Sequence, residues 1–140
     1  MRVGDVLHMY VPVLHGDPKH KFVVLVCCDA PMRYVLINSE NAAEVLQNAR
    51  LQATQVQVDA ARHDFLKYDS WIDAHDLFGT DEASLVEALE EGGYRGRLAS
   101  DLLAALKDAI SESPTIAERQ KRRTLDAIDA ELITIADGQF

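Results

Sequence analysis

The run FVVLVCC, from Phe22 to Cys28, most restricts the fold of this 140-residue chain. It is far shorter than the roughly 20 apolar residues that a membrane-spanning helix needs, and it fits a buried strand. Cys27 and Cys28 are the only cysteines. Because neighbours in a strand point to opposite faces, a disulfide between them would be strained. We expect two reduced packing residues, inert because an apolar strand keeps a thiol protonated.

The length of the chain suits one cooperative unit, since two domains of half this size would each have a small core. Hydrophobic residues make up 48% of the sequence, which is a globular composition. The N-terminus, MRVGD, has no apolar signal-peptide core. These features predict one cytoplasmic domain over residues 1–140, with no association with a membrane.

The first half of the chain is predicted to form strands. GDVLHMYV (4–11) is β-prone, and a polar loop with Gly16 and Pro18 follows it. After FVVLVCC, the turn signal at 29–31 and RYVLIN (33–38) suggest two adjacent strands of a meander. Residues 51–59, LQATQVQVD, nearly alternate between polar and apolar near their end, as in a strand with one exposed face. Residues 39–50 have the apolar spacing of a helix.

From Thr80 onward, the apolar spacing changes to that of helices. Three helices are predicted: the first ends at a pair of glycines, the second has Ser100 as its N-cap, and the third begins with a capping box of Thr115 and Glu118. The apolar residues at helix-face spacing are Leu85, Val86, Leu89, Leu102, Leu103, Leu106, Ile110, Leu125, Ile128 and Leu132.

These patterns predict an α+β fold. Short strands in close succession favour a small barrel or sandwich over residues 1–79. Residues 80–140 form a helical C-terminal extension, which we expect to pack on this core or to form a dimer surface.

The formal charge of −9 lowers the expectation of a nucleic-acid partner, because phosphate binding needs clustered Lys and Arg. The charge is uneven, however. Residues 1–75 hold 7 Lys and Arg against 9 Asp and Glu, whereas residues 76–140 hold 7 against 14. A local basic groove in the first half is therefore compatible with the composition.

The segments GDVLHMYVPVL, GDPKHKFVVLV, VLINSE and FLKYDSWID together resemble the PemK/MazF-like family, the toxins of bacterial toxin-antitoxin pairs. Gly4 and Asp5 match the family's opening. Lys21 stands where the family usually has a catalytic Arg, and Ser39 falls near its catalytic Thr or Ser. The sequence departs from the family where Lys21 and Phe22 replace the usual Arg-Pro pair, and the smallest members lack the helices after residue 80.

The resemblance implies an SH3-like barrel, usually a homodimer, that cleaves RNA without a metal or other cofactor and is neutralised by an antitoxin protein. The ribose 2′-oxygen would attack the neighbouring phosphorus, and the catalytic candidates are His20, Lys21 and Ser39. The residues themselves agree with this chemistry, since Lys19, His20 and Lys21 supply two cations and an imidazole that titrates near neutrality. Asn38 adds a short polar side chain that suits RNA binding.

The segment FLKYDSWIDAH (65–75) mixes apolar residues with Lys67, Asp69 and Ser70. In a strand, Lys67 and Asp69 share a face, and a local bulge would bring Ser70 round to it. On the barrel interpretation these three residues contact RNA, and Tyr68 or Trp71 offers a stacking surface. The alternative is an exposed Lys-Asp pair worth about 0–1 kcal/mol, with both aromatic residues in the core.

Each other candidate also has a purely structural interpretation. Residues 19–21 would be a solvated loop, and Ser39 would be the N-cap of the helix that follows. The five histidines lack metal-ligand spacing, so no metal site is predicted. For the whole chain, the alternative to a nuclease is an inactive barrel that binds protein or nucleic acid in a defence or regulatory complex.

Overall fold

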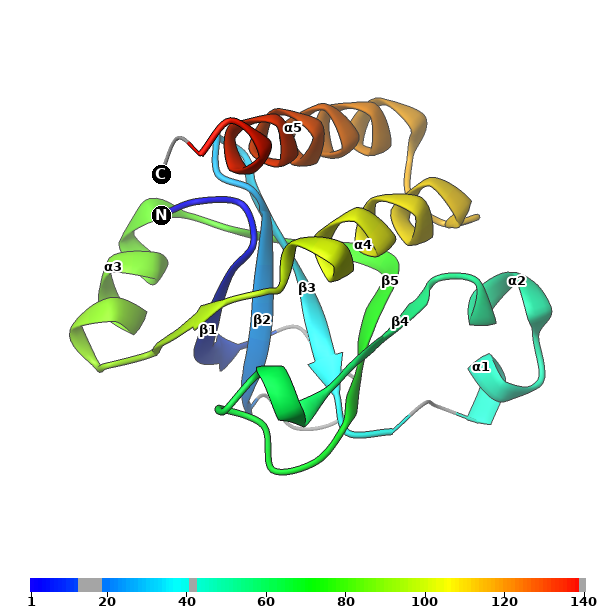
Figure 1. Cartoon of the computed structure of the whole chain (residues 1–140), viewed down its shortest axis with the longest axis horizontal. Helices are drawn as coiled ribbons and strands as arrows, with labels where there is room; N and C mark the ends of the chain where they lie inside the picture. Colours follow the sequence, from blue (N-terminus) through cyan, green and yellow to red (C-terminus); the bar gives the residue numbers. More distant parts are fainter. Residues whose placement is uncertain (13–18, 41–42, 139–140) are drawn as a thin grey trace.

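The structure, a computed structural model, describes residues 1–12, 19–40 and 43–138. An antiparallel sheet in the order β4-β5-β3-β2-β1-β6 curls into a half-barrel (Figure 1). Its strands are β1 Asp5–Val11, β2 Lys19–Cys27, β3 Met32–Asn38, β4 Gln55–Val58, β5 Ser70–Thr80 and β6 Tyr94–Arg97. The helices are α1 Ala43–Leu46, α2 Ala49–Gln52, α3 Glu82–Glu90, α4 Ser100–Glu112 and α5 Glu118–Ala136, with a short 3-10 helix, η1, at Ala60–Arg62. The α+β class and three C-terminal helices are confirmed.

From Val23 to Cys27 the central strand β2 is buried on both faces, which explains the unbroken apolar run there. Val24 and Val26 belong to a core formed with α4 and α5, whereas Val23 and Leu25 belong to a second core on the opposite face, under α3. Pairing of β2 with β3 confirms the predicted meander. The polar loop predicted around residues 16–18 lies outside the described residues.

Both cysteines are free thiols, as predicted. Cys27 is buried, and Cys28 is partly buried. Burial is the main cause that raises the pKa of Cys28 to about 11. The Cys28 thiol is therefore protonated at neutral pH, and its reactivity is low.

Helices α4 and α5 cover one face of the sheet (Figure 1). Leu103, Leu106 and Ile128 are fully buried there, which confirms their predicted inward direction. The predicted caps are wrong, because Ala99 and Ala117 hold the N-cap positions and neither makes a side-chain capping bond. None of the helices in residues 1–12, 19–40 and 43–138 is long and apolar enough to cross a bilayer.

Helix α3 packs on the other face through Leu85 and Ala88. Val86 and Leu89, which were predicted to face inward with Leu85, are exposed. The predicted glycine stop is confirmed, because Gly92 follows the helix with a φ of +76°, a conformation that favours glycine.

Strand β6 was not predicted, and it lies within the segment expected to be helical. It pairs with β1 and completes the sheet at this edge. Arg97 of β6 donates to the buried Asp5 carboxylate at 2.9 Å, and Gly4 has a φ of +94° with the Arg97 side chain close by. Gly4 and Asp5 therefore join the start of the chain to β6.

The single helix predicted over residues 39–50 is wrong in extent. Two four-residue helices, α1 and α2, stand there instead. The Asn48 side chain accepts hydrogen bonds from the backbone N–H groups of Arg50 and Leu51, so Asn48 starts a new helix where the predicted one would continue.

Replacing Leu25 with alanine tests the two-sided core. Leu25 is fully buried in β2, so Leu25→Ala is expected to lower the free energy of unfolding by about 2–5 kcal/mol in urea titrations. Val86→Ala, at an exposed site on α3, is the control and should change it by less than about 0.5 kcal/mol. Equal stability of the two variants would contradict this packing.

Candidate functional site

A cleft of about 270 Å³ lies at the end of the sheet where β2 begins and β3 ends. Strand β1 contributes one lining residue, and the start of β2 contributes three. One residue comes from β3 and one directly follows it. The others come from the segment before β5 and from its first residue. The lining residues are His8, His20, Lys21, Phe22, Ile37, Ser39, Phe65, Leu66, Lys67, Tyr68 and Ser70. Five of the eight residues predicted from the sequence, namely His20, Lys21, Ser39, Lys67 and Ser70, therefore line one cavity.

The pairing of β1 with β2 places two histidines in contact. His8 pairs with Phe22, and Tyr10 pairs with His20. Because alternate residues of a strand share a face, these four rings lie on the same side of the sheet. The His8 and His20 rings stack with their centroids 5.6 Å apart, and His8 lies 4.9 Å from Phe22.

The row of rings continues into the segment between η1 and β5. Phe65 lies 5.3 Å from Phe22 and 5.8 Å from His63, measured between ring centroids. At the other end, the exposed Tyr10 contacts the edge of His20. Aromatic faces of this kind stack on bases without sequence preference.

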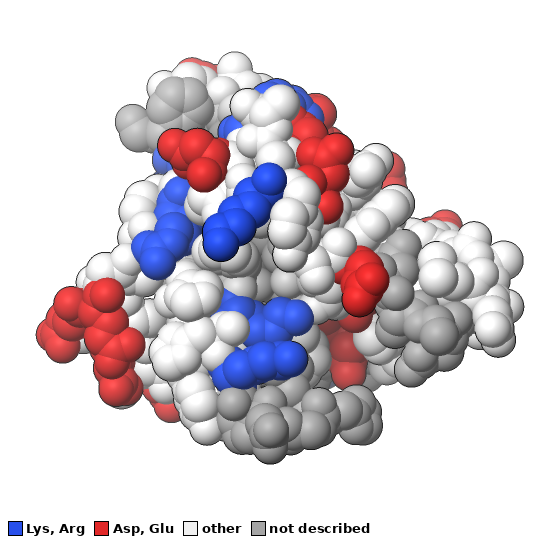
Figure 2. Space-filling view, turned by 90° about the horizontal axis from the view of Figure 1, so that it is seen from below, with Lys and Arg blue, Asp and Glu red and all other residues white. Residues whose placement is uncertain are grey.

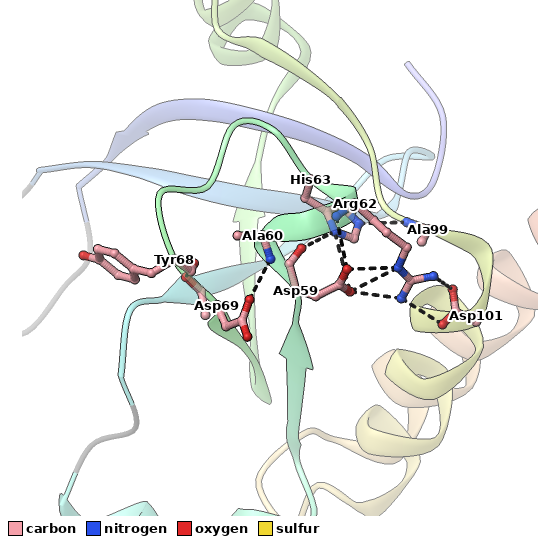
Figure 3. Close-up of polar contacts among 9 residues, drawn as sticks. Asp59, Ala60, Arg62, His63, Tyr68, Asp69, Ala99 and Asp101 are labelled. Atoms are coloured by element: carbon pink, nitrogen blue, oxygen red, sulfur yellow. Dashed lines mark hydrogen bonds and ion pairs between the residues drawn. The ribbon is translucent and has the colours of Figure 1, made fainter.

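Figure 3 shows how the segment that carries Phe65 is held in place. Arg62 forms ion pairs with Asp59 at 3.0 Å and with Asp101 of α4 at 2.8 Å. The buried His63 ring lies between the carbonyl oxygen of Asp59, 2.8 Å from Nδ1, and the backbone N–H of Ala99, 3.2 Å from Nε2. Nδ1 must therefore carry the hydrogen, and Nε2 accepts from Ala99. The Arg62–Asp101 ion pair and the hydrogen bond from Ala99 to His63 fix the wall of the cleft to the N-terminal end of α4.

Asp69 does not line the cleft. Its carboxylate accepts a hydrogen bond from the Ala60 backbone N–H at 2.8 Å, which closes the segment on itself (Figure 3). The strand predicted over residues 65–75 begins only at Ser70, so Lys67 and Asp69 lie in a loop and do not share a strand face. The Ser70 hydroxyl donates to the Tyr68 carbonyl, and Ser70 is buried.

Lys21 is half-buried and contacts Asn38. It lies two residues before Val23, and Asn38 lies two residues after Leu36, the strand partner of Val23. The Lys21 ammonium group donates to the Asn38 side-chain oxygen. Burial and the charge of the exposed Lys19 lower the pKa of Lys21, while Asp73 opposes the shift.

Ser39 lies directly after β3 and lines the cleft, four residues before α1 begins. The N-cap interpretation of Ser39 depends on a stretch that includes residues 41–42, which lie outside the described residues.

Charges of opposite sign occupy different parts of the surface. Figure 2 shows Lys and Arg side chains near the middle of the lower face, with Asp and Glu around them and in a group over α3. Two other hollows flank α3, and their linings include Asp81, Glu82, Glu87 and Glu91. The cleft lining, by contrast, includes Lys21 and Lys67 and no carboxylate. Of these three hollows, only the cleft combines cations with imidazoles.

His8 was missed by the sequence analysis, although it lines the cleft beside His20. Its signal was present in GDVLHMYV, where His8 and Tyr10 interrupt an apolar strand at alternate positions. Burial is the main cause that lowers the pKa of His8 from 6.5, and the charges of Arg95 and His20 act in the same direction. His8 is therefore neutral at pH 7 and able to accept a proton.

Comparison with models of protein families gives no match, and no curated protein matches the sequence. Within the described residues, no group of three or more His, Cys, Asp and Glu side chains is arranged to hold a metal ion. The side chains that line the cleft include two histidines, two lysines and two serines.

The His8 assignment predicts a titration below pH 6.5. Imidazole NMR signals of His8 should give this lowered pKa, and Arg95→Gln should raise it because one cation is removed. Arg119→Gln, an exposed substitution on α5, should leave it unchanged. Since the unfolded chain binds this proton more tightly, His8 should make the protein less stable as the pH falls through about 6.5. A His8 pKa above 6.5 would contradict the buried environment.

Asp69 is predicted to act on the structure of the loop. Asp69→Ala removes the acceptor for the Ala60 N–H and should lower stability by about 0.5–1.5 kcal/mol. Asp69→Asn keeps a side-chain oxygen and should retain most of the stability. Thermal unfolding of both variants measures the difference, and equal losses would show that the hydrogen bond is not the cause.

Proposed function

We propose that this chain is a metal-independent endoribonuclease toxin of the PemK/MazF-like type, built on an SH3-like barrel. The observation that carries the proposal is the cleft itself, whose lining combines His8 and His20 with two lysines and a row of aromatic rings. The curled antiparallel sheet and the position of Lys21 at the start of β2 agree with the family pattern. Neutralisation by an antitoxin and action as a homodimer belong to the same proposal.

RNA cleavage of this kind needs a base, an acid and donors directed at the phosphate. In the proposed reaction, neutral His8 takes the proton of the ribose 2′-hydroxyl, and the 2′-oxygen bonds to phosphorus. The bond from phosphorus to the 5′-oxygen breaks, and that oxygen takes a proton from His20. The products are a cyclic phosphate and a free 5′-hydroxyl, so the step needs no oxidant or co-reactant.

Lys21 and Lys67 would stabilise the charge that develops on the phosphoryl oxygens, and Ser39 would add a hydroxyl donor. The half-buried position of Lys21 favours this role, because a charge acts more strongly where water is excluded. Lysine offers a point charge where arginine offers a planar fork with two parallel donors. The activity is therefore expected to be weaker than with arginine at this position.

One observation favours the second candidate, an inactive barrel that binds nucleic acid or protein. The Lys21 ammonium group already has a partner in Asn38. By strand alternation both side chains lie on the face of Val23, opposite to the imidazoles, so Lys21 must leave this contact and reach past the end of the sheet to meet a phosphate beside them. A barrel that binds without cleaving would use the same rings and cations.

Three variants distinguish these functions on a single-stranded RNA in the presence of EDTA. Lys21→Ala should lower the cleavage rate by about 10²–10³ and change RNA binding little, because Lys21 acts mainly on the transition state. Lys21→Arg should keep or raise the rate. Lys107→Ala, on α4 with its ion pair to Asp129, is the matched control and should cleave like the wild type.

Equal cleavage by the wild type and Lys21→Ala would remove Lys21 from the mechanism. If the wild type binds RNA and does not cleave it, the binding function replaces the nuclease.

A further inference from the structure

Apart from the cleft and the two hollows that flank α3, another hollow borders Phe65, and it is the second hollow that this ring lines. Its volume is about 320 Å³, and it runs between η1 and β6. Arg62, Arg95 and Arg97 line it, together with His63 and Phe65. Phe65 also lines the cleft, so the two cavities share this ring.

The three arginines differ in what neutralises them. Arg62 is paired with Asp59 and Asp101, and Arg97 is paired with Asp5. Arg95 donates to main-chain carbonyls instead, those of Gly92 at 2.5 Å and Tyr94 at 3.3 Å. Among the ion pairs of residues 1–12, 19–40 and 43–138, none includes Arg95.

The backbone directs Arg95 away from the regular pattern of the sheet. Val6 pairs with Gly96 and the next residue, Leu7, pairs with Tyr94, so Arg95 is the extra residue of a β-bulge. Gly96 follows it with a φ of +117°. Bulges of this kind re-aim a side chain and recur beside binding sites. The bulge therefore gives a local reason for Arg95 to leave the edge of the sheet.

Arg95 also lies within electrostatic reach of the first cleft. Its charge contributes to the lowered pKa of His8, after burial. His8 lines the cleft, while Arg95 lines the second hollow. Because the two cavities share Phe65, a chain of nucleotides with one phosphate beside the two imidazoles can continue past this ring to Arg95. Asp64 also lines the hollow, and its charge works against an anion there.

We infer that the hollow is a phosphate-binding subsite, in which Arg95 holds a backbone phosphate of a single-stranded RNA next to the one in the cleft. This rests on the proposed function. Arg95 suits the role because a guanidinium fork donates two parallel bonds to phosphate oxygens. Arg62 and Arg97 shape the walls, and their carboxylate partners offset their charges. Phe65, which lines both cavities, and the neighbouring Phe22 ring offer a stacking surface for a base.

The test measures binding of a fluorescent single-stranded oligoribonucleotide that is fully 2′-O-methylated and therefore resists cleavage. Affinity is followed over a range of salt concentrations for the wild type, Arg95→Gln and Arg119→Gln. Affinity falls as salt rises, and Arg95→Gln should make the slope of log affinity against log salt less steep by about 0.7, the value for one phosphate on a single strand. Its affinity should fall about tenfold at low salt. Arg119→Gln removes the same charge from exposed α5 and should leave both quantities near the wild type.

An unchanged slope for Arg95→Gln, or an equal change for Arg119→Gln, would overturn the subsite. If Arg95→Gln fails to fold, Arg95→Lys is the second test. Lysine keeps the charge, so the salt slope should not change, but it loses the two parallel donors of the guanidinium group, so affinity should fall severalfold. Unchanged affinity would overturn the role of the guanidinium group. Cleavage of the unmodified RNA is measured separately. A wild type that binds without cleaving would refute the nuclease and leave the subsite standing, whereas a wild type that does not bind RNA would refute the subsite.

Discussion

The arrangement of the protein depends on burying β2 on both of its faces. A strand with apolar residues at odd and even positions needs a cover on each side of the sheet. Helices α4 and α5 cover one side, and α3 covers the other. The acidic second half of the chain is therefore a structural requirement of the first.

These covers end before the strands do, and the candidate site lies in the part they leave open. At this end, β1 and β2 carry His8, Tyr10 and His20 in place of aliphatic residues, while the segment from η1 to β5 closes over Phe22. Arg62 and His63 tie that segment to α4, so the same helix that seals the core also positions the wall of the cleft.

Periodicity predicted the elements that bury a regular stripe of apolar residues. It found β2, β3, α4 and α5, because burial of a face imposes a repeat on the sequence. Strand β6 has the sequence YRGR, which carries no apolar alternation, and only its pairing with β1 makes it a strand. The predicted N-caps of α4 and α5 were wrong. Ser100 and Thr115 have side chains suited to capping, but the N-cap positions are held by Ala99 and Ala117.

The sequence predicted those residues of the candidate site that lie at adjacent ends of neighbouring strands. His20 and Lys21 lie near the start of β2, and Ser39 follows β3. Antiparallel pairing of these two strands therefore brings the three residues to the same end of the sheet. His8 depends on the register of β1 against β2, and Arg95 depends on a bulge in a strand that has no sequence signal. Both features arise from pairing between distant segments, which a single sequence does not specify.

The pairing of β6 with β1 also affects the order in which the protein matures during translation. Strand β1 emerges from the ribosome before β6 and gains this neighbour only after residue 97 has emerged, and the wall of the cleft gains its anchor only with Ala99 and Asp101. A nascent chain that carries His8, His20 and Lys21 thus still lacks the parts that hold them in a cleft.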